Sequence, residues 1–163
     1  MSQDKDYKKS ADFATKLGIY LQQHGWYLVT AESCTGGWIA SAATAIAGSS
    51  AWFDRGFVTY SNAAKQELLD VRSETLAKYG AVSEQTVLEM VKGALAHSHA
   101  QVGVAISGIA GPSGGTPDKP IGTIWIAYAS PHNTYAKRYF FSGSRNSIRE
   151  QSVITALRQL ISV

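Results

Sequence analysis

Side chains that could attack a carbonyl group lie in two segments of the chain. Residues 30–37 (TAESCTGG) contain Ser33, and in residues 48–65 Ser50 precedes an apolar run that Lys65 follows. A lysine can act as general base for a serine when burial or nearby positive charge lowers its pKa enough to leave it neutral. Ser-Lys hydrolysis is therefore one chemistry that these residues could support. The structural alternative is that Lys65, at the start of an expected helix, is a solvated surface residue.

The first segment could also bind an anion. A strand is expected to run into a helix at residues 30–37, and the first N–H groups of a helix have no partner within it. Gly36 and Gly37 would let a phosphate or carboxylate approach Thr35 and the helix start closely. The alternative is that a hydroxyl of the segment caps the helix and the glycines serve packing. Glu32 would repel phosphate, so we expect it to act as a cap or to bind a hydroxyl or an amide.

A second glycine-rich loop covers residues 107–115 (SGIAGPSGG). It follows an expected strand at Ser107 and Gly108, but it matches neither the Walker pattern nor the Rossmann pattern. Successive N–H groups in such a loop can form a concave anion site or an oxyanion hole. The alternative is a long surface turn.

The cysteine and the histidines define the other candidate chemistries. Cys34 is a second possible nucleophile, because the start of a helix lowers the pKa of a thiol, although lone cysteines are usually small buried hydrophobes. As the only cysteine, it allows no internal disulfide and no structural zinc site by itself. The four histidines form no HExxH pattern, which disfavours a zinc hydrolase. A Ser-His-Asp triad is disfavoured too, although distant residues can meet in a fold.

Hydrophobic periodicity predicts an alternation of strands and helices that would position these residues. We expect strands at 26–31, 52–60, 101–107, 121–129 and 134–141, and helices at 11–24, 38–47, 61–70, 73–80, 84–97 and 144–161. This order predicts an α/β fold: one three-layer α/β/α domain at residues 11–163, with a mixed, mostly parallel sheet of about five strands. Residues 1–10 are expected to be a flexible tail. Ligands in such folds bind at the carboxyl ends of the strands.

Composition agrees with one folded domain. The chain has 163 residues, of which 45% are hydrophobic and 17% are charged. It has no apolar run long enough to cross a bilayer and no signal-peptide pattern, so we expect a cytoplasmic protein without a membrane partner. The net charge is +3, but Lys and Arg are dispersed, which disfavours nucleic acid as a partner.

Six motifs in order resemble one family. The chain resembles the CinA C-terminal family, and within it the single-domain nicotinamide-nucleotide amidases, over about residues 12–161. The motifs are TAESCTGG at 30–37, AGSSAWFDRGFVTYSNAAK at 47–65, AVSE at 81–84, SGIAGPSGG at 107–115, KPIGTIWIA at 119–127 and FSGSR at 141–145. The combination is far more specific than any single motif.

The resemblance implies a function and a site. It implies hydrolysis of nicotinamide mononucleotide to nicotinate mononucleotide and ammonia, without metal or cofactor, and makes a homodimer a reasonable expectation. Carried over by position, Ser50 would be the nucleophile, Lys65 its base, and Tyr60 a hydroxyl that orients or relays the proton. Arg145 could bind the nucleotide phosphate, as could the turn at Ser107 and Gly108 or the helix start at 35–37.

Two questions stay open at this point. The nucleophile could instead be Ser33 or Cys34, and the sequence does not assign the two glycine loops to phosphate or oxyanion binding. A different class of function is also consistent with these motifs, namely a nucleotide-binding or competence-related accessory module without catalysis. Such a module would bind a nucleotide and would not turn it over.

Overall fold

A five-stranded sheet forms the middle layer of the computed structural model, which describes the backbone of residues 2–163 and the side chains of residues 8–163. The strands are arranged in the order β2-β1-β3-β4-β5. Their bounds are β1 Leu28–Glu32, β2 Phe53–Val58, β3 Val102–Gly108, β4 Thr123–Ala129 and β5 Thr134–Phe140. β1 pairs parallel with β2 and β3, and β4 pairs antiparallel with β3 and β5. The expected mixed sheet is confirmed, but the expected majority of parallel pairs is not, because two of the four pairs are antiparallel.

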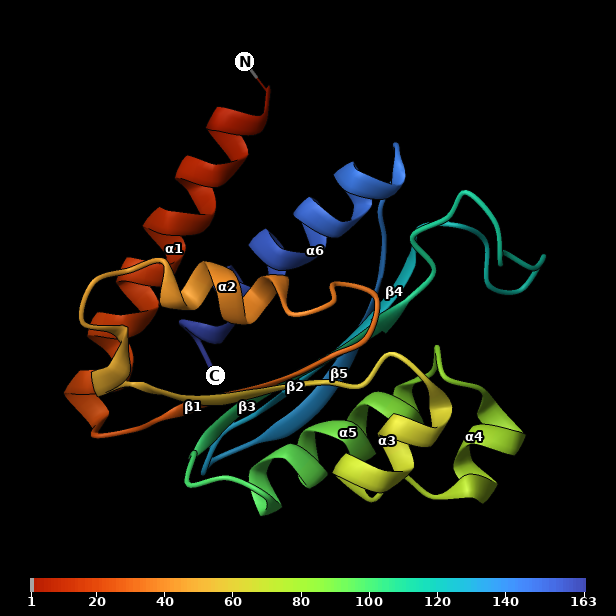
Figure 1. The fold of residues 1–163 in the computed structure, drawn as a ribbon, viewed down its shortest axis with the longest axis horizontal. Helices are drawn as coiled ribbons and strands as arrows, with labels where there is room; N and C mark the ends of the chain where they lie inside the picture. Colours follow the sequence, from red (N-terminus) through yellow and green to blue (C-terminus); the bar gives the residue numbers. More distant parts are fainter. Residues whose placement is uncertain (1) are drawn as a thin grey trace.

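Helices cover both faces of this sheet (Figure 1). One face carries α1 (Ser2–His24), α2 (Trp38–Thr44) and α6 (Arg145–Leu160), and the other carries α3 (Asn62–Leu69), α4 (Ser73–Tyr79) and α5 (Glu84–Ala96). A short 3₁₀ helix at Ser49–Ala51 precedes β2. Helix α1 includes residues 2–10, which were expected to be a tail; the flexibility of residues 1–10 stays a prediction. In residues 2–163, no helix combines the length and apolar composition that crossing a bilayer requires.

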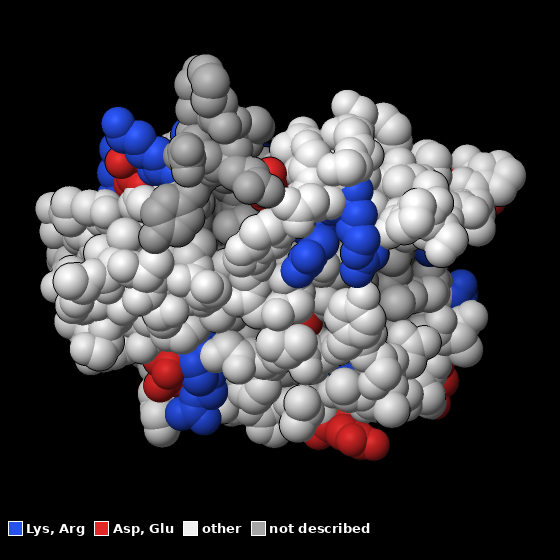
Figure 2. All heavy atoms as spheres, turned by 45° about the horizontal axis from the view of Figure 1, so that its top comes forward, with Lys and Arg blue, Asp and Glu red and all other residues white. Residues whose placement is uncertain are grey.

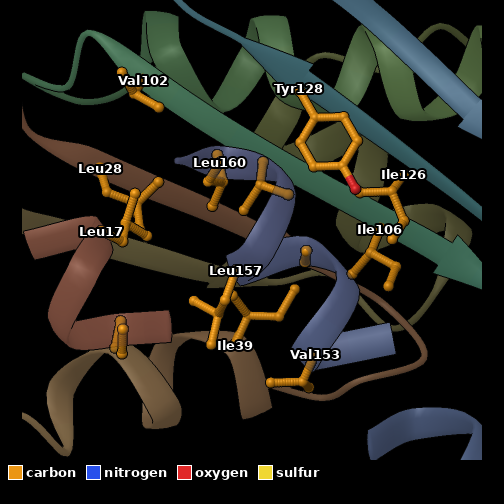
Figure 3. Packing of buried hydrophobic residues seen from close by; sticks show 14 of the residues in the cluster. Leu17, Leu28, Ile39, Val102, Ile106, Ile126, Tyr128, Val153, Leu157 and Leu160 are labelled. Atoms are coloured by element: carbon orange, nitrogen blue, oxygen red, sulfur yellow. The ribbon is translucent and has the colours of Figure 1, made fainter. Parts of the chain in front are cut away.

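The side chains of β1 point alternately to the two faces of the sheet, and each face has its own part of the core. Leu28 belongs to the apolar cluster under α1, α2 and α6, whereas Val29 and Ala31 belong to the cluster under α3, α4 and α5. Figure 3 shows the first cluster, in which Leu28 and Leu17 lie beside residues of α6 such as Leu157 and Leu160. Because side chains alternate along a strand, Ser33, directly after β1, continues on the side of α3.

Helix α3 is held in place by a cap and by one close helix contact. The Ser61 side chain accepts a hydrogen bond from Ala64 N at 3.0 Å, which begins the helix. On its other side α3 packs against α5 at Gly93, where an added Cβ would overlap the carbonyl group of Leu69. Glycine therefore sets the distance between the helices, and this distance positions the side chains of α3 relative to the strand ends.

Candidate functional site

Ser33 and Lys65 meet at the carboxyl ends of β1 and β2. The Ser33 N–H donates to Ile106 O of β3 at 3.0 Å, which extends the ladder by one residue and fixes the serine backbone. Lys65, in the first turns of α3, places its Nζ 3.0 Å from Ser33 Oγ and 2.8 Å from Thr59 O. The structure thus pairs a serine hydroxyl with a lysine amine.

Burial makes this lysine unusual. Lys65 is only 1% exposed, and no acidic side chain within residues 8–163 pairs with its amine. Desolvation lowers the pKa of Lys65, while the nearby Cys34 acts in the opposite direction. Burial also raises the pKa of Cys34 to about 12, so the thiol is uncharged near neutral pH and gives the ammonium ion little support. A neutral amine can donate to Thr59 O while its lone pair accepts the Ser33 hydroxyl proton.

A cavity of about 230 Å³ opens at this pair. It collects most of the residues that the sequence singled out, from segments far apart in the chain. Its walls are formed by Ser33, Cys34, Tyr60, Asn62, Lys65, Ala81, Val82, Ser107, Gly108, Ala110 and Arg145.

Tyr60 and Arg145 are linked to each other at this cavity. Arg145 Nη2 donates to the Tyr60 hydroxyl oxygen at 3.1 Å, and its Nη1 donates to Gly111 O at 2.8 Å. The guanidinium group has five N–H donors, so others are left for an anion. Tyr60 is 63% exposed, in keeping with a position at the rim of the cavity.

Ser107 and Gly108 end β3 next to Ser33. Ser107 is buried, and Gly108 lies so close to β4 that an added Cβ would overlap Ile124 Cδ1. Both residues line the cavity, and their expected part in binding phosphate or the oxyanion stays a prediction. Packing against β4 alone explains why glycine occupies position 108.

The helix start at 35–37 is not available to a ligand, contrary to the phosphate-binding hypothesis. Glu32 accepts hydrogen bonds from Thr35 Oγ1 at 2.7 Å, from Ile39 N at 2.8 Å and from Ala40 N at 3.0 Å. Its carboxylate thus occupies the place that an anion would take at the start of α2. Gly36 and Gly37 have positive φ angles of 59° and 95°, so they shape the turn, and neither lines the cavity. The expectation that Glu32 acts as a cap is confirmed.

Ser50 lies at the wrong end of the sheet to meet Lys65. It belongs to the 3₁₀ helix before β2, and because β1 and β2 are parallel, that position is at their amino ends. Lys65 follows β2 and lies at the carboxyl ends. The implied pairing of Ser50 with Lys65 is therefore contradicted, and the hydroxyl beside the amine is that of Ser33.

Cys34 lines the cavity, but its environment does not suit a thiolate nucleophile. Helix α2 begins only at Trp38, so the expected stabilisation of a thiolate by a helix start is absent at residue 34. Burial raises the pKa of the thiol, whereas reactive cysteines have a lowered one.

Asn62, Ala81, Val82 and Ala110 were not recognised as site residues from the sequence. Asn62 follows the same strand as Tyr60, so a search for polar residues after strand ends would have found it. Ala81, Val82 and Ala110 carry no polar group, and only the fold reveals their position.

Charge is dispersed on the face of the molecule that Figure 2 shows. On the face that Figure 2 presents, the side chains of Lys and Arg form small groups separated by uncharged and acidic residues. Among the described residues on that face there is no continuous basic track of the kind that a nucleic-acid backbone requires.

A family model, curated relatives and a solved structure each match nearly the whole chain. The model of the CinA C-terminal domain matches residues 10–163. The nicotinamide-nucleotide amidohydrolase PncC of Enterobacter agglomerans is 52% identical, covering 94% of this chain and 97% of that protein. PncC of Escherichia coli K12 is 53% identical, and the match covers 89% of this chain and 88% of that protein. The crystal structure of competence/damage inducible protein CihA from Agrobacterium tumefaciens superposes with a TM-score of 0.91 at 46% identity, covering 94% of each chain.

Proposed function

The chain belongs to the CinA C-terminal domain family, and we propose that it is an amidohydrolase that converts nicotinamide mononucleotide and water to nicotinate mononucleotide and ammonia. Relatives named nicotinamide-nucleotide amidohydrolase are about half identical to it over nearly their whole length, which supports this reaction. The observation that carries the mechanism is the 3.0 Å approach of Lys65 Nζ to Ser33 Oγ.

Ser33 is the nucleophile and Lys65 its general base. The neutral amine takes the hydroxyl proton as Ser33 Oγ bonds to the carboxamide carbon, and a tetrahedral oxyanion results. The resulting ammonium ion then gives its proton to the leaving nitrogen, so that ammonia departs and an acyl ester remains on Ser33. Water, deprotonated by the same amine, then attacks the ester; the ammonium ion gives that proton to Ser33 Oγ as it leaves, so that the nicotinate product and the free serine result. Desolvation of Lys65 supports this role because it favours the neutral amine.

The N–H of Cys34 is suited to hold the oxyanion. The Ser33 carbonyl accepts from Gly36 N at 3.0 Å, and in a planar trans peptide the Cys34 N–H points away from that carbonyl. Within residues 2–163 this N–H makes no backbone–backbone hydrogen bond. A donor adjacent to the nucleophile in the chain needs no rearrangement as the charge develops.

Arg145 and Tyr60 bind the phosphate end of the substrate. Arg145 is the one guanidinium group that borders the cavity among the described residues. Its bond to Tyr60 orients both groups before the ligand arrives, and its remaining N–H donors can form paired hydrogen bonds with phosphate oxygens. The Tyr60 hydroxyl offers a further donor at the rim.

The test is ammonia release from nicotinamide mononucleotide by purified, chelator-treated protein. Nicotinamide riboside is the matched control substrate, because it lacks only the phosphate. We expect turnover of the mononucleotide and a much weaker reaction of the riboside. Arg145→Met should lose this selectivity and hydrolyse the two substrates at similar rates. Binding of the mononucleotide without ammonia release at any pH near neutrality would contradict the proposal and favour a non-catalytic nucleotide-binding module.

A further inference from the structure

Arg149 contacts the turn that carries Ser33 from the side of α6. Its Nε donates to Cys34 O at 3.0 Å, and its Nη2 donates to Thr35 O at 3.1 Å. The guanidinium carbon lies 4.7 Å from the ring centroid of Trp38, the first residue of α2. One side chain thus holds two successive carbonyl groups directly after the serine.

These bonds fix the orientation of the turn. A peptide group is planar, so a carbonyl held in one direction also fixes the N–H of the following residue. The Ser33 carbonyl is held by Gly36 N, and Arg149 holds the next two carbonyls, those of Cys34 and Thr35. Every carbonyl from 33 to 35 therefore has a partner: Arg149 bonds to Cys34 O, and it shares Thr35 O with Trp38 N, which donates at 3.2 Å. Hydrogen bonds from a charged donor are stronger than neutral ones and hold a geometry better.

Arg149 differs in position from Arg145, four residues earlier on α6. Residues four apart lie on the same side of a helix, so α6 presents both guanidinium groups toward the site. Arg145 borders the cavity, whereas Arg149 does not. Arg149 Nε and Nη2 donate to main-chain carbonyls and its guanidinium carbon lies over the Trp38 ring, which leaves the group poorly placed to bind the substrate.

We propose that Arg149 is a positioning residue: by holding the Cys34 and Thr35 carbonyls it keeps Ser33 Oγ at Lys65 and the Cys34 N–H in place for the oxyanion. The inference rests on the proposed nucleophile, Ser33. It does not depend on which amide the enzyme cleaves. We call the two hydrogen bonds from Arg149 to Cys34 O and Thr35 O the Arg149 clamp. Its loss should slow attack by Ser33 while leaving substrate binding nearly intact.

The first measurement is the rate at which a fluorophosphonate labels Ser33. The serine oxygen bonds to phosphorus, fluoride leaves, and Lys65 takes the hydroxyl proton, so the rate reports nucleophile activation without requiring the natural substrate. We expect Arg149→Ala to lower this rate by about tenfold or more, because small displacements of a reacting group are costly. Arg149→Lys should lower the labelling rate nearly as much, since an ammonium group cannot replace the planar guanidinium group that bonds to both carbonyls. Arg158→Ala, at an exposed position in the last turn of the same helix, is the control and should label like wild type.

Guanidinium ions and steady-state kinetics separate positioning from folding. Guanidinium chloride, kept below denaturing concentrations, should restore part of the labelling rate in Arg149→Ala and should not accelerate wild type. With nicotinamide mononucleotide, kcat should fall and KM should change little. Wild-type labelling by Arg149→Ala, a raised KM with unchanged kcat, or a loss that follows the folded fraction without guanidinium rescue would each overturn the proposal. A wild-type protein that labels at Ser33 but releases no ammonia would contradict the proposed substrate and leave the positioning role standing.

Discussion

Lys65 Nζ and Ser33 Oγ are 3.0 Å apart although the residues follow different strands, β2 and β1. The contact exists because parallel neighbours end at the same edge of the sheet, where the lysine side chain reaches across to the serine. Burial that would be costly for an ammonium ion is much less costly for a neutral amine. At this position the protonated form of the amine is disfavoured, and the neutral form can act as a base beside the Ser33 hydroxyl.

Three single substitutions distinguish the candidate nucleophiles. Ser33→Ala should lower kcat by about three orders of magnitude or more, as removal of a nucleophile does in other serine hydrolases. Ser50→Ala removes the same atom at the amino ends of the strands and should retain nearly wild-type kcat. Cys34→Ala should also remain active, because its buried thiol is protonated. Ammonia release under saturating substrate measures all three; an inactive Ser50→Ala with an active Ser33→Ala would reverse the assignment.

The burial of Lys65 predicts a specific dependence of stability on pH. Its folded-state pKa is lowered by desolvation, so between that value and the ordinary 10.5 the unfolded chain binds more protons than the folded one. The free energy of unfolding contributed by this group must therefore rise with pH through that window. Lys65→Met lacks the effect, and urea unfolding at a series of pH values should show wild type gaining on it as pH rises. Lys92→Met, exposed on α5, is the control; parallel curves for wild type and Lys65→Met would contradict a lowered pKa.

Glu32 should stabilise the start of α2 and the serine turn together. In Glu32→Gln the amide nitrogen would face an N–H donor that the carboxylate now accepts from. A buried donor left without a partner costs about 1–3 kcal/mol, so urea unfolding should show a loss of this size. Glu67→Gln, at an exposed position of α3, makes the same chemical change and should cost less than about 0.5 kcal/mol. Equal stabilities of the two variants would show that the cap contributes little.

Gly93 should control the position of Lys65 through the distance between α3 and α5. A methyl group at this position would overlap the Leu69 carbonyl, one helical turn beyond Lys65, and would push α3 away from α5. Gly93→Ala should therefore lower stability by about 1–3 kcal/mol, as overpacking does, and should also lower kcat. Lys92→Ala is the control on the same helix. A stable Gly93→Ala variant with wild-type kcat would contradict the proposed spacing role.

Much of the fold was predictable because local signals agreed with it. The Ser83 and Ser144 side chains cap α5 and α6 by accepting hydrogen bonds from Thr86 N and Ser147 N, and apolar segments of the sequence predicted all five strands. The antiparallel pairing of β3 with β4 was not expected. The loop between them contains no helix, and parallel neighbours need a crossover connection that such a loop does not provide.

The site was predictable in part. Ser33 and Ser50 are both serines in recognised motifs, and residue type alone does not separate them. Their place relative to a strand does: Ser33 follows β1, as Lys65 follows β2, whereas Ser50 precedes β2. The Arg149 clamp joins residues more than a hundred positions apart, and nothing in the local sequence indicates it.

The most direct measurement is a titration of the Lys65 amine by NMR, with ¹³C-labelled lysine side chains and the Lys65 signal assigned by its loss in Lys65→Met. We expect one lysine to titrate well below all the others, with the same apparent pKa limiting kcat/KM on the acid side. A Lys65 signal that titrates together with the surface lysines, in an enzyme that still releases ammonia near neutral pH, would contradict the role of Lys65 as general base.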